Sequence, residues 1–256
     1  MGKAFAIDAA SGQKKWQFSA GDAGRGLLVN GSELLIGTQT DAFFVNIETG
    51  EQIAKVTLGC EMSDITGFAV NSDKTLAYFG GRNGYIGAVD LTTHTAKTPL
   101  LAGTTNPNTI YEPVVAPNGS IFAGSKNGSV YNVKGDLSAV NWEHVHTGKA
   151  VNNTYNYSHP CVDSENRFYI TAGQTTNTSY IFDAEGRVLD SWSYTGTTAA
   201  AQRQMGGNNY LDGVFYSAFI GNGDQNGMFV GKYVGGERAS SWSTHGGDIC
   251  GSCCVK

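Results

Sequence analysis

The spacing of tryptophan is the feature that most constrains the fold of this 256-residue chain. Trp142, Trp192 and Trp242 are 50 residues apart, and Trp16 lies three steps of 42 residues before Trp142. Each tryptophan follows a turn that contains glycine, which indicates that all four occupy the same place in a repeat. A period of about 40 to 50 residues is typical of architectures built from repeated units.

Tight turns separate short runs of residues that are typical of strands. Asn-Gly pairs, the strongest short signal for a β-hairpin, occur at 30–31, 83–84, 118–119, 127–128 and 226–227. The unit is clearest in 109–148, where three turns separate four such runs and the last run contains Trp142. Convincing amphipathic helical stretches are absent, and glycine is abundant at 35 residues.

Repeated units of four antiparallel strands predict an all-β protein, and specifically a β-propeller, in which small sheets stack face to face around an axis. A β-sandwich is the competing prediction, but it does not explain a repeated turn followed by tryptophan. The predicted single domain, 1–256, has a partial blade in 1–22, complete blades in 23–59, 60–103, 104–148, 149–196 and 197–247, and a C-terminal strand or tail in 248–256. We therefore expect five complete blades and a half blade, about six in all.

Two ways of closing this ring remain open. Either the tail after Trp242 offers about one strand to the closing blade, or the sequence is part of a larger propeller with further blades or domains upstream, which we favour. In both cases the four tryptophans are predicted to be structural residues that pack across to the next blade. Two repeats lack tryptophan and offer Val56 and Leu100 instead, so we expect thinner seams there.

The first repeat carries a motif with defined positions. Ala6, Asp8, Ser11, Gly12 and Trp16 match the pattern Ala-x-Asp-x-x-Thr/Ser-Gly-x-x-x-Trp. The repeat therefore resembles that of the pyrroloquinoline-quinone-type propellers, the quinoprotein alcohol dehydrogenase-like superfamily, although the later copies are degenerate. The resemblance implies the propeller fold but no single chemistry, because the family includes quinone-dependent dehydrogenases, assembly scaffolds and surface-binding proteins.

The dehydrogenase members of that family generally have eight blades, a calcium ion beside the quinone and an aspartate base. Some also carry a vicinal disulfide over the cofactor. This chain has too few blades, and its adjacent Cys253 and Cys254 lie in the tail. We therefore expect no cofactor and keep a diverged quinoprotein only as an alternative.

Charge and hydropathy exclude some classes of partner. The net charge of −5 argues against nucleic acid, which requires a basic surface, and no apolar run is long enough to span a membrane. No signal peptide is visible after Met1. We expect an exported bacterial protein, periplasmic or extracellular, whose leader is absent from this sequence. A cytoplasmic location is the alternative.

Polar side chains precede the innermost strands, which line the central channel of a propeller. Aligning these strands predicts a ring of equivalent positions at Arg25, Thr66, Glu112, His159 and, less clearly, Gln204. Such a ring is able to hold a small anion or a sugar, although a mutually bonded polar plug is the more common arrangement. The loops that enter these strands add Tyr111, Asn153, Tyr155, Tyr157 and Arg203, which together suit carbohydrate or peptide binding.

Three of the five cysteines, Cys250, Cys253 and Cys254, lie in the tail. One interpretation is a disulfide that fastens the tail, with Cys60 or Cys161 as a partner. A second is that these thiols are small buried apolar side chains. Both are favoured over a zinc site, because metal sites prefer two separated pairs of ligands.

The sequence favours a binding module over an enzyme. It contains no evident Ser/His/Asp order or phosphate-binding loop, and His144 and His146 have no third metal ligand nearby, so we expect no metal. We expect a non-catalytic binding or scaffold propeller that holds a small polar ligand, a glycan or a protein partner at its funnel. An enzyme that uses the channel ring on a glycan, and a structural segment that presents an attached domain, are the alternatives.

Overall fold

The computed structural model describes residues 2–64, 66–104, 109–145, 156–157, 159–173, 176–195, 209–211, 213–219, 228–233 and 254–255. These residues form mainly strands, because short runs rich in β-branched and aromatic residues alternate with turns that contain glycine. The one helical element within them is the 3-10 turn η1 (Arg82–Gly84), and no described helix is long and apolar enough to cross a membrane. The predicted all-β class is confirmed.

Six sheets follow one another along the described chain. The half blade contains β1 (Lys3–Ile7) and β2 (Lys14–Ser19). Sheet 2 contains β3 (Gly26–Asn30), β4 (Glu33–Gly37), β5 (Asp41–Asn46), β6 (Gln52–Thr57) and β24 (Cys254–Val255). Sheet 3 contains β7 (Ala69–Val70), β8 (Leu76–Gly80), β9 (Tyr85–Asp90), β10 (Thr95–Ala96) and β11 (Leu100–Leu101).

The remaining three sheets complete the series. Sheet 4 contains β12 (Val114–Val115), β13 (Ile121–Gly124), β14 (Ser129–Val133) and β15 (Val140–Val145). Sheet 5 contains β16 (Asn156–Tyr157), β17 (Cys161–Val162), β18 (Phe168–Gly173), β19 (Thr176–Phe182) and β20 (Val188–Thr195). Sheet 6 contains β21 (Asn209–Leu211), β22 (Val214–Phe219) and β23 (Met228–Tyr233).

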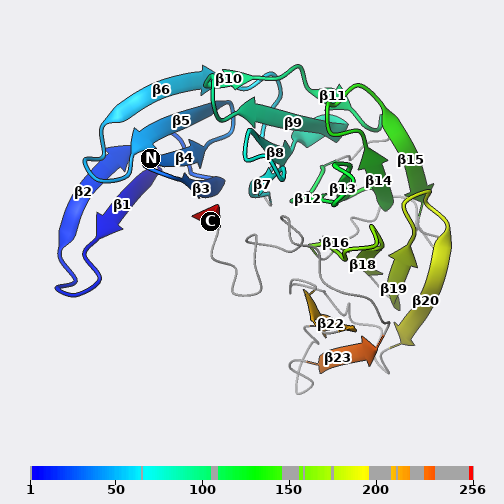
Figure 1. Ribbon diagram of the computed structural model, residues 1–256. Coiled ribbons are helices and arrows are strands. Elements are labelled where there is room, and N and C mark those ends of the chain that lie inside the picture. Colours follow the sequence, from blue (N-terminus) through cyan, green and yellow to red (C-terminus); the bar gives the residue numbers. More distant parts are fainter. Residues whose placement is uncertain are drawn as a thin grey trace.

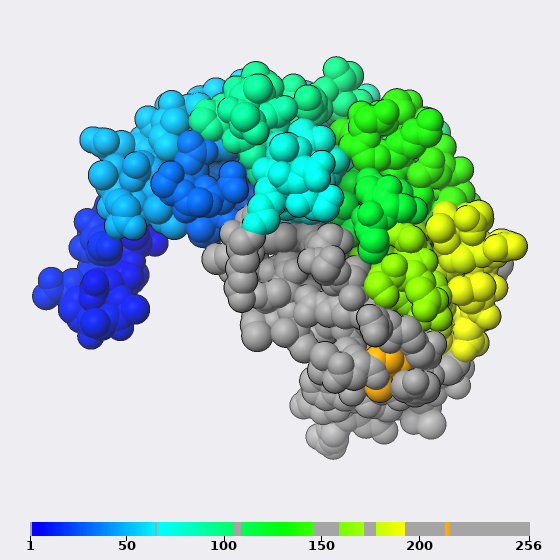
Figure 2. All heavy atoms as spheres, in the orientation of Figure 1, coloured from blue at the N-terminus to red at the C-terminus, as the bar shows by residue number. Residues whose placement is uncertain are grey.

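The sheets stand side by side along an arc, with β3, β7, β12 and β16 toward its centre and β6, β15 and β20 on its outer side (Figure 1). The half blade projects from one end of this arc (Figure 2). Buried side chains gather between neighbouring sheets, and the largest cluster joins sheets 2, 3 and 4. This radial stacking of antiparallel sheets confirms the predicted propeller.

The C-terminal strand β24 lies beside the innermost strand of sheet 2. Cys254 pairs with Val29 and Val255 pairs with Asn30, in parallel orientation, and Figure 1 places the C-terminus next to β3. One predicted closure had the tail supply a strand to the half blade. In the structure the tail strand pairs with β3 instead.

Trp16 and Trp142 fill the seams between sheets in the same way. Each indole Nε1 donates a hydrogen bond of 2.8 Å to a backbone carbonyl in a turn of the next sheet. The glycine that ends that turn lies against the ring. A Cβ atom on Gly50 would come within 2.7 Å of Trp16, and one on Gly186 within 2.6 Å of Trp142. Each tryptophan is therefore matched to a residue without a side chain.

The strand register corrects the predicted equivalence of the tryptophans. A β-bulge interrupts the pairing of the two outermost strands, and Trp16 and Trp142 each form the first regular pair beyond it. In sheet 5, Trp192 stands two residues further along its strand. In sheet 2 the equivalent of Trp16 is Ala54 rather than Val56. Equal spacing in the sequence concealed this shift because turns of different length join the strands.

Trp192 nevertheless reaches the next sheet, where its ring lies 5.9 Å from that of Phe215. His144 has the same register position in sheet 4, and its ring lies 4.9 Å from Phe182 of sheet 5. His144 is therefore a seam residue. Trp242 and His146 lie outside the described residues.

Between sheets 2 and 3, the seam without tryptophan is filled from the turn. His94 takes the left-handed conformation (φ 52°) that glycine takes at Gly50 in the preceding sheet. Its ring packs at a tilt against that of Phe44 of sheet 2, with the centroids 4.1 Å apart, where the outer strand offers only the small Ala54. Leu137, also at positive φ (60°), is buried at the next seam. We expected these seams to be thinner because they lack tryptophan. In the structure a large side chain from the turn fills the space instead.

Lowering the pH should destabilise the seam that contains His144. Burial lowers the pKa of this imidazole below its ordinary value of 6.5. The unfolded chain therefore binds the proton more tightly than the folded one, so the free energy of unfolding falls as the pH drops below about 6.5. Urea unfolding between about pH 7.5 and pH 5 should show a shallower pH dependence in His144→Gln than in the parent chain. Identical pH dependence in both proteins would contradict this assignment.

Candidate functional site

The antiparallel strand order brings particular segments together at one end of every sheet. In sheet 2, Gly26 at the start of the inner strand pairs with Gly37, which pairs in turn with Ala42 across the β4–β5 turn. We call this end the funnel face. It is formed by the connections that lead into β3, β7, β12 and β17 and by the turns β4–β5, β8–β9 and β13–β14.

The register moves two members of the predicted ring by one residue. Each inner strand pairs with the second strand at an equivalent position, occupied by Val29, Val70, Val115 and Val162. Counting back three residues from these valines gives Gly26, Gly67, Glu112 and His159. Arg25 and Thr66 are one residue earlier and correspond to Tyr111. A shift of one residue in a strand turns a side chain to the opposite face.

The ring position of sheet 3 is a glycine because the next sheet fills its space. A Cβ atom on Gly67 would lie 2.5 Å from Oε2 of Glu112, so this carboxylate packs directly against the backbone of sheet 3. The same carboxylate oxygen lies 3.9 Å from Nδ1 of His159 in sheet 5. Glu112 is buried, whereas His159 is partly exposed. The structure therefore brings two of the predicted ring residues together.

Thr66 and Tyr111 have other surroundings. The hydroxyl of Thr66 accepts a hydrogen bond of 2.8 Å from the backbone N–H of Gly80 and donates one of 3.2 Å to the carbonyl of Gly67. Tyr111 is buried in the core between sheets 4 and 5, and this burial raises the pKa of its phenol. Both side chains serve packing or backbone contacts in the described structure.

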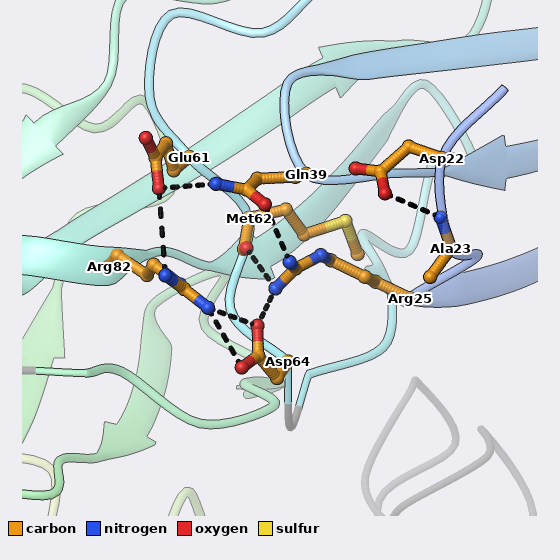
Figure 3. A network of polar contacts seen from close by, with 8 residues as sticks. All are labelled: Asp22, Ala23, Arg25, Gln39, Glu61, Met62, Asp64 and Arg82. Carbon is orange, nitrogen blue, oxygen red and sulfur yellow. Dashed lines mark hydrogen bonds and ion pairs between the residues drawn. The ribbon is translucent and has the colours of Figure 1, made fainter. Parts of the chain in front are cut away.

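Arg25 takes part in a polar network that joins sheets 2 and 3 (Figure 3). Its Nη1 donates a hydrogen bond of 3.0 Å to the carbonyl of Met62, and its Nη2 donates one of 2.9 Å to Oε1 of Gln39. Gln39 in turn donates from Nε2 to Oε2 of Glu61, at 2.8 Å. Burial, and secondarily the positive charge of Arg82, lowers the pKa of Arg25.

Asp64 lies between the two arginines of this network (Figure 3). Its carboxylate forms an ion pair with Nη1 of Arg25, and Nη2 of Arg82 donates to both of its oxygens at 2.7 and 2.8 Å. The Asp64 side chain is 61% exposed, whereas that of Arg25 is 10% exposed. Within the described residues, the buried Nε of Arg25 has no hydrogen-bond partner.

The sequence-based set contained Arg25 but missed its partners Gln39, Glu61, Asp64 and Arg82. These residues lie on a turn, an irregular connection and η1, where no strand periodicity exists to align them. Their only sequence signal is position, because each falls in a segment that leads into an inner strand or joins the second and third strands. Of the other predicted residues, Asn153, Tyr155, Arg203 and Gln204 lie outside the described residues, and only the backbone of Tyr157 is described, in β16.

The two described cysteine side chains differ in exposure. Cys60 is a free thiol, and burial raises its pKa to about 12, so it is protonated at neutral pH. Cys161 is fully buried in the core cluster that also contains Phe215. Cys250 and Cys253 lie outside the described residues, and only the backbone of Cys254 is described, so the disulfide and zinc interpretations stay predictions.

The described side chains do not fit the calcium ion that the quinone-dependent relatives would imply. Calcium requires several oxygen ligands. The described part of the chain contains no group of three or more acidic, histidine or cysteine side chains that could hold a metal. On the funnel face, Glu61 and Asp64 are bonded to Gln39 and to the two arginines instead.

Comparison with known proteins supports the fold and nothing finer. No protein-family model and no curated protein matches this sequence. The crystal structure of the computationally designed Ika8 protein is similar, with a TM-score of 0.63 and 16% identity. The match covers 91% of this chain and 66% of the designed protein, so this chain spans about two thirds of its length. The resemblance to propeller repeats that the sequence indicated is thus shown at the level of the fold.

A second similar structure is that of BamB from Moraxella catarrhalis, with a TM-score of 0.49 and 16% identity. That match covers 91% of this chain and 79% of the BamB chain.

Proposed function

We propose that this chain is a non-catalytic propeller that binds a polar ligand, a glycan or a protein partner on its funnel face. The observation that carries the proposal is the concentration there of polar side chains that bond between sheets. Arg25 bonds to the connection that precedes sheet 3, and Glu112 contacts both Gly67 and His159. The extracytoplasmic location expected from the sequence is part of the same proposal.

At the opposite ends of the sheets, many polar side chains serve their own turns. There, Asp8, Asn46, Asp90 and Asp183 each accept hydrogen bonds from backbone N–H groups of their own turn. Such Asx-turns use the side chain to stabilise local backbone. Polar contacts between sheets occur at both ends, as between His94 and Glu33, but the network around Arg25, which joins two sheets through several side chains, lies on the funnel face.

A glycan-active enzyme is the second candidate, and the proximity of Glu112 and His159 favours it. A carboxylate and an imidazole in contact form a pair that is able to transfer protons. Their separation of 3.9 Å exceeds hydrogen-bond length, and Glu112 is shielded from solvent. We therefore rank binding above catalysis.

A glycan array tests the proposal with the intact chain. The array signal should fall by about tenfold or more in Glu112→Gln and in His159→Ala, because one bidentate or charged contact is worth about that factor. Glu185→Gln, an exposed acidic change in a turn away from the funnel face, is the matched control and should bind normally. Equal signals in all four proteins would contradict the proposed site, and no signal in any of them would exclude a glycan as its ligand. Release of cleaved sugar that stops in Glu112→Gln would favour the enzyme.

A further inference from the structure

Two guanidinium groups from different sheets converge on one carboxylate at the funnel face. Arg25 precedes β3 of sheet 2, Arg82 belongs to η1 of sheet 3, and Asp64 comes from the connection between the two sheets. Convergent arginines are the usual means by which proteins hold carboxylate and phosphate groups. The arrangement has the geometry of an oxyanion site that the chain fills itself.

Arg25 is held by contacts that do not involve Asp64, whereas Arg82 is held by Asp64 and Glu61. The carbonyl of Met62 and Oε1 of Gln39 fix both terminal nitrogens of Arg25, and Glu61 fixes Gln39 in turn. Arg25 is nine-tenths buried, and its Nε has no partner among the described residues. Asp64 is the most exposed member of the group. Arg25 is therefore a fixed donor that faces the most exposed carboxylate of the group (Figure 3).

We propose that Arg25 and Arg82 form a binding site for a carboxylate group of a ligand, and that Asp64 occupies this site in the free protein. The inference rests on the proposed function and names the chemical class that the funnel face recognises. When Asp64 moves outward, Glu61 and, at longer range, Asp22 are the acids that still act on the two guanidinium groups. A carboxylate of the ligand then replaces the negative charge that Asp64 supplied.

Asp64 acts in this scheme as a tethered competitor. A group attached by a short segment competes at an effective concentration in about the millimolar range. A ligand that displaces it needs further contacts on the funnel face, and an isolated carboxylate should bind only weakly to the unmodified chain. Removing the Asp64 carboxylate should therefore tighten carboxylate binding without adding any new contact.

Isothermal titration of the full chain with sodium glucuronate tests this displacement. Asp64→Ala should bind glucuronate about tenfold or more tightly than the parent chain, since the internal competitor is gone. Methyl glucoside, which lacks the charge, should show no gain. Adding Arg82→Gln to Asp64→Ala should abolish the gain. Sodium N-acetylalaninate, a monoanion without a sugar ring, is titrated in parallel to distinguish the source. An equal gain means that the carboxylate alone is recognised, and a gain with glucuronate alone means an acidic sugar.

Glu61→Ala is the matched control, because it removes the same unit of charge from the same network but leaves Asp64 between the arginines. Its effect on glucuronate affinity should stay within about twofold, as expected for an exposed and screened charge. Equal gains in Glu61→Ala and Asp64→Ala, or no gain in Asp64→Ala with its thermal unfolding unchanged, would overturn the inference. Failure of the proposed function would be recognised by a different result: glycan binding would be unaltered in Glu112→Gln and His159→Ala.

Discussion

Trp142→Ala should lower the free energy of unfolding by about 3 kcal/mol, the lower part of the range for large-to-small changes at aromatic residues. The indole lies among the rings of Phe122, Phe168 and Phe182, at centroid distances of 5.7, 6.2 and 5.5 Å. Two of these rings belong to the next sheet. Truncation therefore opens a cavity at the seam and removes the donor that bonds to a backbone carbonyl of sheet 5.

Urea unfolding followed by circular dichroism measures this change. Val145→Ala is the control, because Val145 lies on the same strand but is exposed, and it should change the free energy by no more than about 0.5 kcal/mol. A loss below about 1 kcal/mol for Trp142→Ala would mean that the seam closes around the smaller side chain.

Asp163→Ala should cost about 3 kcal/mol, because it breaks a buried ion pair and leaves the Arg167 guanidinium group with only the exposed carboxylate of Glu165, 3.6 Å away. The carboxylate is fully buried and accepts hydrogen bonds from Nε of Arg167 at 2.6 Å and from the hydroxyl of Tyr169 at 2.7 Å. It also accepts the backbone N–H of Arg167 at 2.9 Å and thereby orders its own turn. Removing it affects both the turn and the core.

The chain contains a matched control for this change. Asp183 and Arg187 repeat the same Asp-x-Glu-x-Arg turn with the same 2.6 Å contact, but Arg187 is 77% exposed where Arg167 is 20% exposed. Asp183→Ala should therefore cost only about 1–2 kcal/mol, from a solvated pair and the turn hydrogen bonds. Chemical denaturation of both variants measures the difference, which reflects the burial of the Asp163 pair and its additional hydrogen bond from Tyr169. Equal costs would refute the argument.

Much of the fold could be predicted from the sequence because it depends on repeated local signals. Asn-Gly turns and degenerate copies of the motif that ends at Trp16 recur along the chain, so they mark several of the turns that delimit the sheets. The exact register of the strands could not be predicted, because the turns and connections between them differ in length. This is why Arg25 and Thr66 were aligned with Glu112 although Gly26 and Gly67 are its structural equivalents.

The candidate site was harder to predict for a different reason. Gln39, Asp64 and Arg82 come together through tertiary structure alone, from segments without periodicity. Loops carry such groups because their backbone is free of the constraints of a sheet. His94 also escaped prediction, since glycine is the usual residue at positive φ and a histidine there is explained only by tertiary contacts, with the ring of Phe44 and the carboxylate of Glu33.

The matching of side chains across the seams has a consequence for how such a chain can change over evolutionary time. A blade that presents tryptophan, as at Trp16 or Trp142, requires a successor with glycine in its turn, whereas the small Ala54 is followed by His94. Duplicating or transposing a single blade would place two large groups, or two small ones, at one junction. Each blade is therefore constrained by the blade that follows it. Exchanging one blade requires a matching change in the turn residue of its neighbour.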